Sequence, residues 1–406
     1  MTLDVPTGRA ARAWSTRAGG LPREYWFLWW GTFVNRVGTF VQPFLVLYLV
    51  RERGLPEATA GLLLSTYGLA GIPSQLGGGV LADRIGRRQT MLLGSVGFAA
   101  ALAVLGSARS LPLIVVGVLL TGLTSDLFRP ASSALVADVV PPADRPRAYG
   151  LTFWAVNLGF AVATALAGLL AEQGYGLLFV GDALTTVIFG LVVYRGVGET
   201  RPVRDPLEKS GSFLDPFRDR LMIGVIISWF LYACVYFQVF LTLPLAMTAD
   251  GLAPRTYGLV LALNGVVIVI VQPLSLGWLA RLPRMPTAGA SMALVGVGFG
   301  LNAFAETGWQ YAACVVVWTL GEIGVASVGH AVVADIAPAQ LRGRYAGAFG
   351  IAFGAAGVVA PVLGTAVLAS SGASAVWSGC LLIGLVAGAV QLSLSAGVIR
   401  RTAVAP

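Results

Sequence analysis

The 406-residue chain is unusually apolar: 56% of its residues are hydrophobic and 11% are charged, and its mean hydropathy is +0.80. This is more apolar surface than one soluble core can bury, so a soluble enzyme or a soluble binding domain is excluded. The formal net charge of +8 would suit a nucleic-acid partner, but the placement of the basic residues, described below, makes that partner unnecessary.

Apolar runs long enough to cross a bilayer, which takes about 20 residues per helix, recur along the chain. We predict an all-α membrane protein with twelve transmembrane helices, at about residues 25–50, 59–82, 90–108, 112–139, 147–172, 175–195, 221–249, 256–280, 288–306, 309–337, 344–370 and 374–399. Cys234, Cys314 and Cys380 all fall within these helices, without the paired spacing of a disulfide framework or a metal site.

Most of the 27 basic residues lie in the tails and in the loops of one membrane side, whereas the opposite loops hold Arg51, Arg53, Arg109 and Arg255. Basic loops face the cytoplasm, so both termini are expected there, and residues 1–23 are expected to be a cytoplasmic tail rather than a cleaved signal peptide. Lys209 is the one basic residue that is not an arginine. This bias is typical of GC-rich bacteria, and we expect a multi-pass protein of the bacterial plasma (inner) membrane.

The helix at 25–50 carries Asn35 and Arg36 near its middle, followed by Gln42. An arginine at mid-bilayer costs at least about 2.5 kcal/mol unless it faces protein or water. We therefore expect these three residues to line a polar cavity.

The loop after residue 82 reads Gly79-Val-Leu-Ala-Asp83-Arg84-Ile-Gly86-Arg87-Arg88. Its glycines allow a close-packed turn, Asp83 can pair with Arg87, and Asp138 offers Arg87 a second carboxylate. We expect a cytoplasmic gate that forms fully only when the two halves of the protein close there, although the arginines also set topology. The predicted gate comprises Gly79, Asp83, Arg84, Gly86, Arg87, Arg88, Asp138 and Asp335.

The helix at 112–139 holds Asp126 and Arg129 deep in an apolar stretch. The two lie on one helix face and can neutralise each other. This pattern leaves two alternatives, a self-satisfied structural pair or part of a site that lines the transport pathway, and the second is favoured because intramembrane charges are usually functional.

Residues 134–150 and 331–347 align without a gap and share, among others, Asp138 with Asp335 and Arg147 with Arg344. A repeat about half the chain apart predicts two pseudo-symmetric lobes. We expect a cytoplasmic tail at 1–23, a six-helix lobe at 24–195, a cytoplasmic linker at 196–220, a second six-helix lobe at 221–399 and a tail at 400–406.

The loop at 79–91, the twelve spans and the repeat together resemble the major facilitator superfamily. This resemblance implies a central cavity lined by the first, fourth, seventh and tenth helices, and a gating role for the loop. Val118 stands where many members carry an arginine. The exporter motif of the fifth helix is only partly present, because Ala163, Thr164 and Ala167 stand where glycine, proline and glycine are usual. The chain looks most like the twelve-helix drug–proton antiporters.

In the second half, Tyr232, Tyr236 and Gln238 add aromatic and hydrogen-bonding groups to the expected cavity, and Glu322 lies near the centre of its helix. In the loop near 281, Arg281 is expected to pair with Asp335. Asp182 is expected to make structural hydrogen bonds, and His330, the one histidine, to be packed or near the surface.

We expect a secondary transporter that works by alternating access and exports small organic or drug-like compounds against protons, with Asp126 and Glu322 as proton carriers. The alternative is a proton-coupled transporter of a metabolite such as a sugar, peptide or amino acid, including uptake. A membrane-embedded enzyme lacks a convergent nucleophile and base, a sensor is disfavoured, and a phosphate-binding loop is absent. We expect no cofactor, no metal, no nucleic-acid partner, and a monomer in the lipid bilayer.

Overall fold

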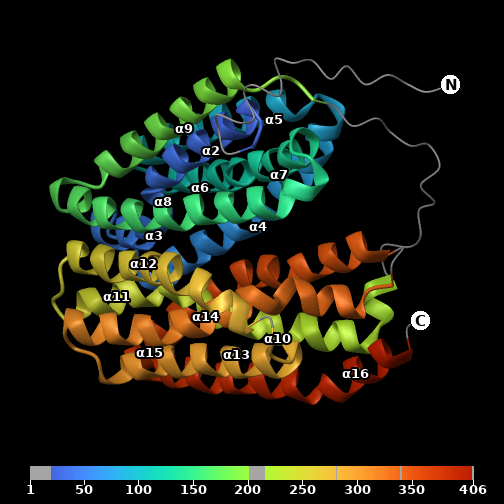
Figure 1. The fold of residues 1–406 in the computed structure, drawn as a ribbon. Coiled ribbons are helices and arrows are strands. Elements are labelled where there is room, and N and C mark those ends of the chain that lie inside the picture. The colour runs from blue at the N-terminus through green and yellow to red at the C-terminus, as the bar shows by residue number, and fades with distance from the viewer. Residues whose placement is uncertain (1–19, 201–214, 280, 339–340, 405–406) are drawn as a thin grey trace.

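The computed structural model describes residues 20–200, 215–279, 281–338 and 341–404, and every regular element within them is helical. Figure 1 shows two layers of long helices, one built from the first half of the chain and the other from the second. We call them the first and second lobes. The described chain ends of both lobes lie at the same end of the molecule, here called the terminal face, and the opposite end is the far face.

The first lobe consists of α2 (Arg23–Val37), α3 (Val41–Leu47), the π-helix Tyr48–Glu52, α4 (Glu57–Arg84), α5 (Arg87–Ser107), α6 (Leu111–Ser125), α7 (Phe128–Val139), the short 3-10 helix Pro142–Asp144, α8 (Arg145–Gln173) and α9 (Gly176–Gly196). The second lobe consists of the 3-10 helix Asp215–Arg218, α10 (Arg220–Tyr236), the 3-10 helix Phe237–Val239, α11 (Thr242–Ala249), α12 (Pro254–Leu279), α13 (Arg284–Gly300), the 3-10 helix Leu301–Phe304, α14 (Gly308–Ile336), α15 (Arg342–Ser393) and α16 (Ser395–Val404).

Ten described helical runs are long and apolar enough to cross a membrane. The last of them, Arg344–Arg401, contains a break at Gly372, where φ is 78° and ψ is 176°. The 28-residue α4 is not among the ten. The membrane fold is confirmed, whereas the count of twelve spans stays a prediction.

The outer surface is apolar, as a bilayer requires. Leu274, Phe304 and Trp309 expose 80%, 79% and 72% of their surface. A soluble protein does not leave many large apolar side chains in water, so lipid is the medium that fits this surface.

Three of the predicted spans are interrupted near their middles: the first and the fourth in the first lobe, and the seventh, which divides into α10 and α11, in the second lobe. The first divides into α2 and α3 around Gly38, where a Cβ atom would overlap the Thr185 side chain of α9. The buried Asp182 accepts the N–H of Val41 at 3.2 Å and so satisfies a donor that the break frees. The fourth divides into α6 and α7 around Asp126, and Pro130 lies in the first turn of α7, where its missing N–H is not needed.

The lobes meet in the half of the molecule nearer the far face. Ser65 on α4 donates to the Val358 carbonyl of α15 at 2.6 Å, and Tyr257 on α12 donates to the Pro43 carbonyl of α3 at 3.1 Å. A Cβ on Gly68 would overlap the carbonyl of Gly357, so glycine is required for this helix crossing. These contacts close the molecule toward the far face.

We predict that Gly68→Val separates the lobes at the far face, because its side chain must displace the backbone of α15. The separation is measured as the distance between spin labels at Glu52 and Ala249, which are exposed positions on opposite lobes. The labels are attached to cysteines introduced at these positions in a protein from which the native cysteines have been removed. Gly71→Val is the matched control, since a Cβ there meets nothing within 4 Å. An unchanged distance in Gly68→Val would contradict this description of the interface.

A second prediction concerns Asp219, which lies before α10 and accepts hydrogen bonds from Tyr345 at 2.9 Å and from Arg401. Burial acts to raise its pKa, but these hydrogen bonds outweigh burial and hold the pKa below its usual value. A depressed carboxylate pKa stabilises the fold above the ordinary value of about 4, and this stability is lost as pH falls through the folded-state pKa.

Asp219→Asn should therefore lower Tm at pH 7.5, and the difference from wild type should shrink progressively as pH falls below the ordinary carboxylate pKa of about 4. Glu172→Gln, an exposed carboxylate at the far face, is the control and should change Tm little across this range of pH. A deficit for Asp219→Asn that stays the same across this range would count against the ion pair as its cause.

Candidate functional site

A cavity of about 430 Å³ lies between the lobes, at the level of the breaks in the first and fourth spans. Its polar lining residues all come from the first lobe: Asn35, Arg36, Thr39, Gln42, Tyr67, Gln75, Ser125, Asp126, Arg129 and Asp182. The second lobe contributes only apolar residues to the lining: Phe237, Phe240, Leu241, Gly350, Phe353, Gly354, Gly357 and Pro361. The first lobe thus supplies all of the polar lining groups, together with apolar side chains that include Phe98 and Phe128, and the second lobe adds a wall that is wholly apolar.

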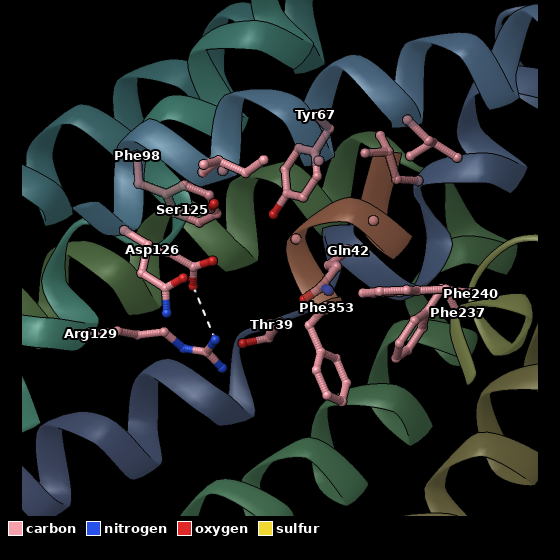
Figure 2. A pocket seen from close by; sticks show the side chains of 18 of the residues that line it. Thr39, Gln42, Tyr67, Phe98, Ser125, Asp126, Arg129, Phe237, Phe240 and Phe353 are labelled. Atoms are coloured by element: carbon pink, nitrogen blue, oxygen red, sulfur yellow. Dashed lines mark ion pairs between the residues drawn. The ribbon is translucent and has the colours of Figure 1, made fainter. Parts of the chain in front are cut away.

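Figure 2 shows how these groups are arranged. Ser125, Asp126 and Arg129 gather on one side together with Phe98, whereas Phe237 and Phe240 lie on the other, and Gln42 and Phe353 lie between the two groups. A molecule that fills the cavity would meet charge at one end and aromatic rings at the other.

Asp126 and Arg129 form an ion pair of 3.2 Å across the break in the fourth span (Figure 2). The Asp126 N–H donates to the Ser74 hydroxyl of α4 at 3.3 Å, which fixes the turn. The side chains are 33% and 51% exposed, so the pair faces the cavity instead of being sealed within the lobe. Both alternatives from the sequence are therefore present at once: the two residues neutralise each other and also line the cavity.

Arg36 lies in the last turn of α2, two residues before the helix break at Gly38. The side chain lines the same cavity, and its Nε atom is buried without a hydrogen-bond partner among the described residues. A Cβ on Gly159 would overlap Arg36, so the bare backbone of α8 supports the helix at this point. Arg36 is a cation held at the middle of the lobe with its donor unsatisfied.

Two neighbours fix the end of α2 beside Arg36. Asn35 donates its side-chain amide to the Thr186 hydroxyl of α9 at 3.2 Å, and Thr39 donates to the Asn35 carbonyl at 3.2 Å. Asp182, on the same α9, holds the start of α3 as described above. Asp182 thus makes a structural hydrogen bond and also lines the cavity.

Glu322 does not line this cavity, which corrects the expectation that it shares a chamber with Asp126 and Arg129. On α14 it faces α12, where the Asn264 amide donates to Glu322 Oε2 at 2.7 Å and to the Thr319 hydroxyl at 3.0 Å. Tyr236 also lies within the second lobe, where it stacks on Tyr232 and packs edge-on against Trp318. Glu322 therefore belongs to a separate polar cluster inside the second lobe.

Tyr232 and Gln238 are likewise held within the second lobe. Tyr232 packs edge-on against Trp229 and Phe353, and Gln238 donates its amide to the Cys234 and Ala360 carbonyls at 3.0 and 3.3 Å. The aromatic residues that do line the cavity were missed in the sequence. Phe237 and Phe240 lie three residues apart, a spacing that could have indicated a shared face.

The loop cluster at the terminal face lies within the first lobe. Arg87 bonds both Asp83 and Asp138, at 3.2 Å to the latter, and Thr200 donates to Asp138 at 2.9 Å. The expectation that the cluster forms fully only when the halves close is wrong, because both acids belong to the lobe of Arg87.

Other members of the predicted gate lie beside this cluster. The backbone N–H groups of Arg88 and Gln89 donate to Glu199, at 3.1 and 3.2 Å. Asp335 pairs with Arg284 instead of the expected Arg281. Among the residues that the structure describes, no group of three or more His, Cys, Asp or Glu side chains could hold a metal ion. The side chain of His330 lies outside the described set.

Comparison with known proteins finds one matching family model and several related transport proteins. The family model for the Major Facilitator Superfamily matches residues 28–324 and 239–403. A Na⁺, Li⁺, K⁺/H⁺ antiporter of Planococcus maritimus is 24% identical over 366 residues, which cover 81% of this chain and 86% of that protein. The multidrug resistance protein MdtH of Cronobacter sakazakii is 26% identical over 333 residues, covering 79% and 81%.

A similar fold occurs in solved structures. The crystal structure of a peptide transporter, POT, in complex with sulfate superimposes with a TM-score of 0.78 at 17% identity, and covers 94% of this chain and 96% of the other. At this identity the match shows the fold alone.

We predict that Arg36→Gln raises the Tm of the ligand-free protein by about 2 °C or more, because it removes a cation whose Nε is buried without a hydrogen-bond partner among the described residues. Arg129→Gln, which leaves Asp126 without its cation, should lower Tm. Thermal unfolding of both purified variants in one detergent tests this. A fall in Tm for Arg36→Gln as large as that for Arg129→Gln would show that Arg36 is paired after all.

Proposed function

Because the chain belongs to the Major Facilitator Superfamily of membrane transporters, we propose that it is a secondary active transporter that exports small organic or drug-like compounds in exchange for protons. The observation that carries this proposal is the cavity at the lobe boundary, which is charged on one wall and aromatic on the other. Such a cavity binds amphipathic molecules by burial of apolar surface, with a few polar groups to orient them.

Alternating access is supported by the lobe contacts. Close glycine contacts and the hydrogen bonds of Ser65 and Tyr257 join the lobes between the cavity and the far face. We propose that the lobes rock as units about the cavity, so that this interface opens when one forms at the terminal face. The Arg87 cluster, already complete within its lobe, would then act as a rigid contact surface at the terminal face.

The distribution of basic residues in the loops supports the cytoplasm as the compartment at the terminal face. On that assignment the far face is extracellular, the structure is closed to the outside, and a substrate enters the cavity from within the cell. The proposed setting is a bacterial plasma membrane, with the transporter acting as a monomer surrounded by lipid.

Asp126 and Glu322 are the proposed proton carriers. Protonation of Asp126 would remove its attraction for Arg129 and release that guanidinium into the cavity. Protonation of Glu322 would weaken its bond from Asn264 on α12, and the next residue, Gly265, packs against the backbone of α8 in the other lobe. Each acid is therefore connected to an element that contacts the substrate or the opposite lobe.

An alternative is a proton-coupled transporter of a specific metabolite, including uptake. The adjacent charges of Asp126 and Arg129 favour it in one respect, because they would suit the two charges of an amino acid or short peptide. A solute panel measured with the purified protein in liposomes distinguishes the two functions.

We predict that Asp126→Asn and Glu322→Gln each slow solute flux driven by a pH gradient at least about tenfold, the effect of about 1.4 kcal/mol on a rate. Flux would be measured in liposomes that contain only this protein, with Glu306→Gln as a control because that acid is exposed in a loop. Wild-type coupling in both variants would overturn the proton-carrier assignment. An absence of flux for every solute with the wild-type protein would overturn the transporter proposal.

A further inference from the structure

The acids that line the cavity already have partners. Asp126 is paired with Arg129, and Asp182 accepts the N–H of Val41. The Arg36 guanidinium carries five N–H donors, and the one on Nε is buried without an acceptor among the described residues, although the Asp126 and Asp182 carboxylates attract the charge from a distance. The cavity therefore offers one cation whose demand for an acceptor the protein itself does not meet.

The unmet donor of Arg36 favours a ligand that carries a negative charge. A buried charge is tolerated when it is paired and hydrogen-bonded, and the strongest partner for a guanidinium is a carboxylate or another oxyanion that accepts two N–H bonds side by side. A cationic ligand would meet an unpaired Arg36 and would have to displace Arg129 from Asp126 before it found an acid. A neutral ligand would leave the Arg36 charge uncompensated.

The lining and the volume of the cavity add a second requirement for the ligand. The charged wall belongs to the first lobe, and the facing wall is formed by Phe237, Phe240 and Phe353 of the second lobe (Figure 2). A volume of about 430 Å³ lies within the range of sites for small organic ligands. The ligand must therefore carry its charge at one end and an apolar, preferably flat, body at the other.

We propose that the cavity binds an organic anion, with its carboxylate on Arg36 and its apolar body against Phe237, Phe240 and Phe353. This assignment rests on the proposed function and narrows its substrate class. It also gives the ligand a position between the lobes, because its two ends are held by different lobes.

The test compares three probes that share one ring system: 2-naphthoate, the neutral 2-naphthamide, and 2-naphthylmethylammonium. Binding to the purified full-length protein would be measured by calorimetry at pH 7.5. Naphthoate should bind at least about tenfold more tightly than the other two, since a bidentate guanidinium pair adds about 1.4 kcal/mol or more. Equal affinities, or tighter binding of the ammonium, would overturn the assignment.

Variants locate the interaction. Arg36→Gln should abolish the preference for naphthoate over naphthamide, Arg36→Lys should retain part of it, and Arg109→Gln, an exposed loop arginine, should leave it unchanged. Phe353→Ala should weaken naphthoate and naphthamide equally, because it removes only the apolar wall. Thermal unfolding of each variant verifies that it is folded. A preference for naphthoate that survives in folded Arg36→Gln would contradict the role of Arg36.

The test of the anion site can fail or succeed independently of the test of the proposed transport function. Export of a cationic dye under a pH gradient without binding of naphthoate would remove the anion assignment and leave the transporter proposal standing. Selective, Arg36-dependent binding of naphthoate without any pH-driven flux would support the site and overturn the proton coupling.

Discussion

The cost of placing charge in hydrocarbon controls the architecture of this protein. An arginine or aspartate at the middle of a transmembrane helix costs on the order of 2.5–3.5 kcal/mol unless it faces protein or water. Arg36, Asp126 and Arg129 meet this constraint by facing one cavity between the lobes, and Glu322 meets it by bonding to Asn264 inside the second lobe. The substrate site and the candidate proton sites follow from where these charges can be accommodated.

The two helix breaks of the first lobe are subject to the same constraint. Breaks free backbone N–H and C=O groups, which must find partners in a medium without water. Asp182 accepts a backbone N–H at the first break, and the Ser74 hydroxyl accepts one at the second. Both breaks lie beside the cavity. Because of the breaks, Arg36 and Asp126 stand at helix ends instead of within continuous helices.

The sequence predicted the fold and part of the site, and its failures have physical causes. Arg36, Asp126 and Arg129 were predictable because a charge in an apolar run must face a polar environment. The direction that Glu322 faces was not, because it depends on how α14 rotates against α12. The aromatic wall was missed since Phe237, Phe240 and Phe353 do not differ in type from core residues. The position of the Arg87 cluster within one lobe could not be predicted, because it depends on the tertiary contact between Arg87 and Asp138.

The proposed substrate site depends on Arg36 and Arg129 lining one polar cavity between the lobes. The most direct test is the rate at which cysteines at these positions react with a charged, membrane-impermeant methanethiosulfonate, in a background without the native cysteines. Leu123→Cys, an exposed apolar position on α6, provides the lipid-facing control. If both side chains line the cavity, Arg36→Cys and Arg129→Cys should react fast and the control should react slowly. Reaction of Arg36→Cys that is as slow as that of the control would contradict this prediction.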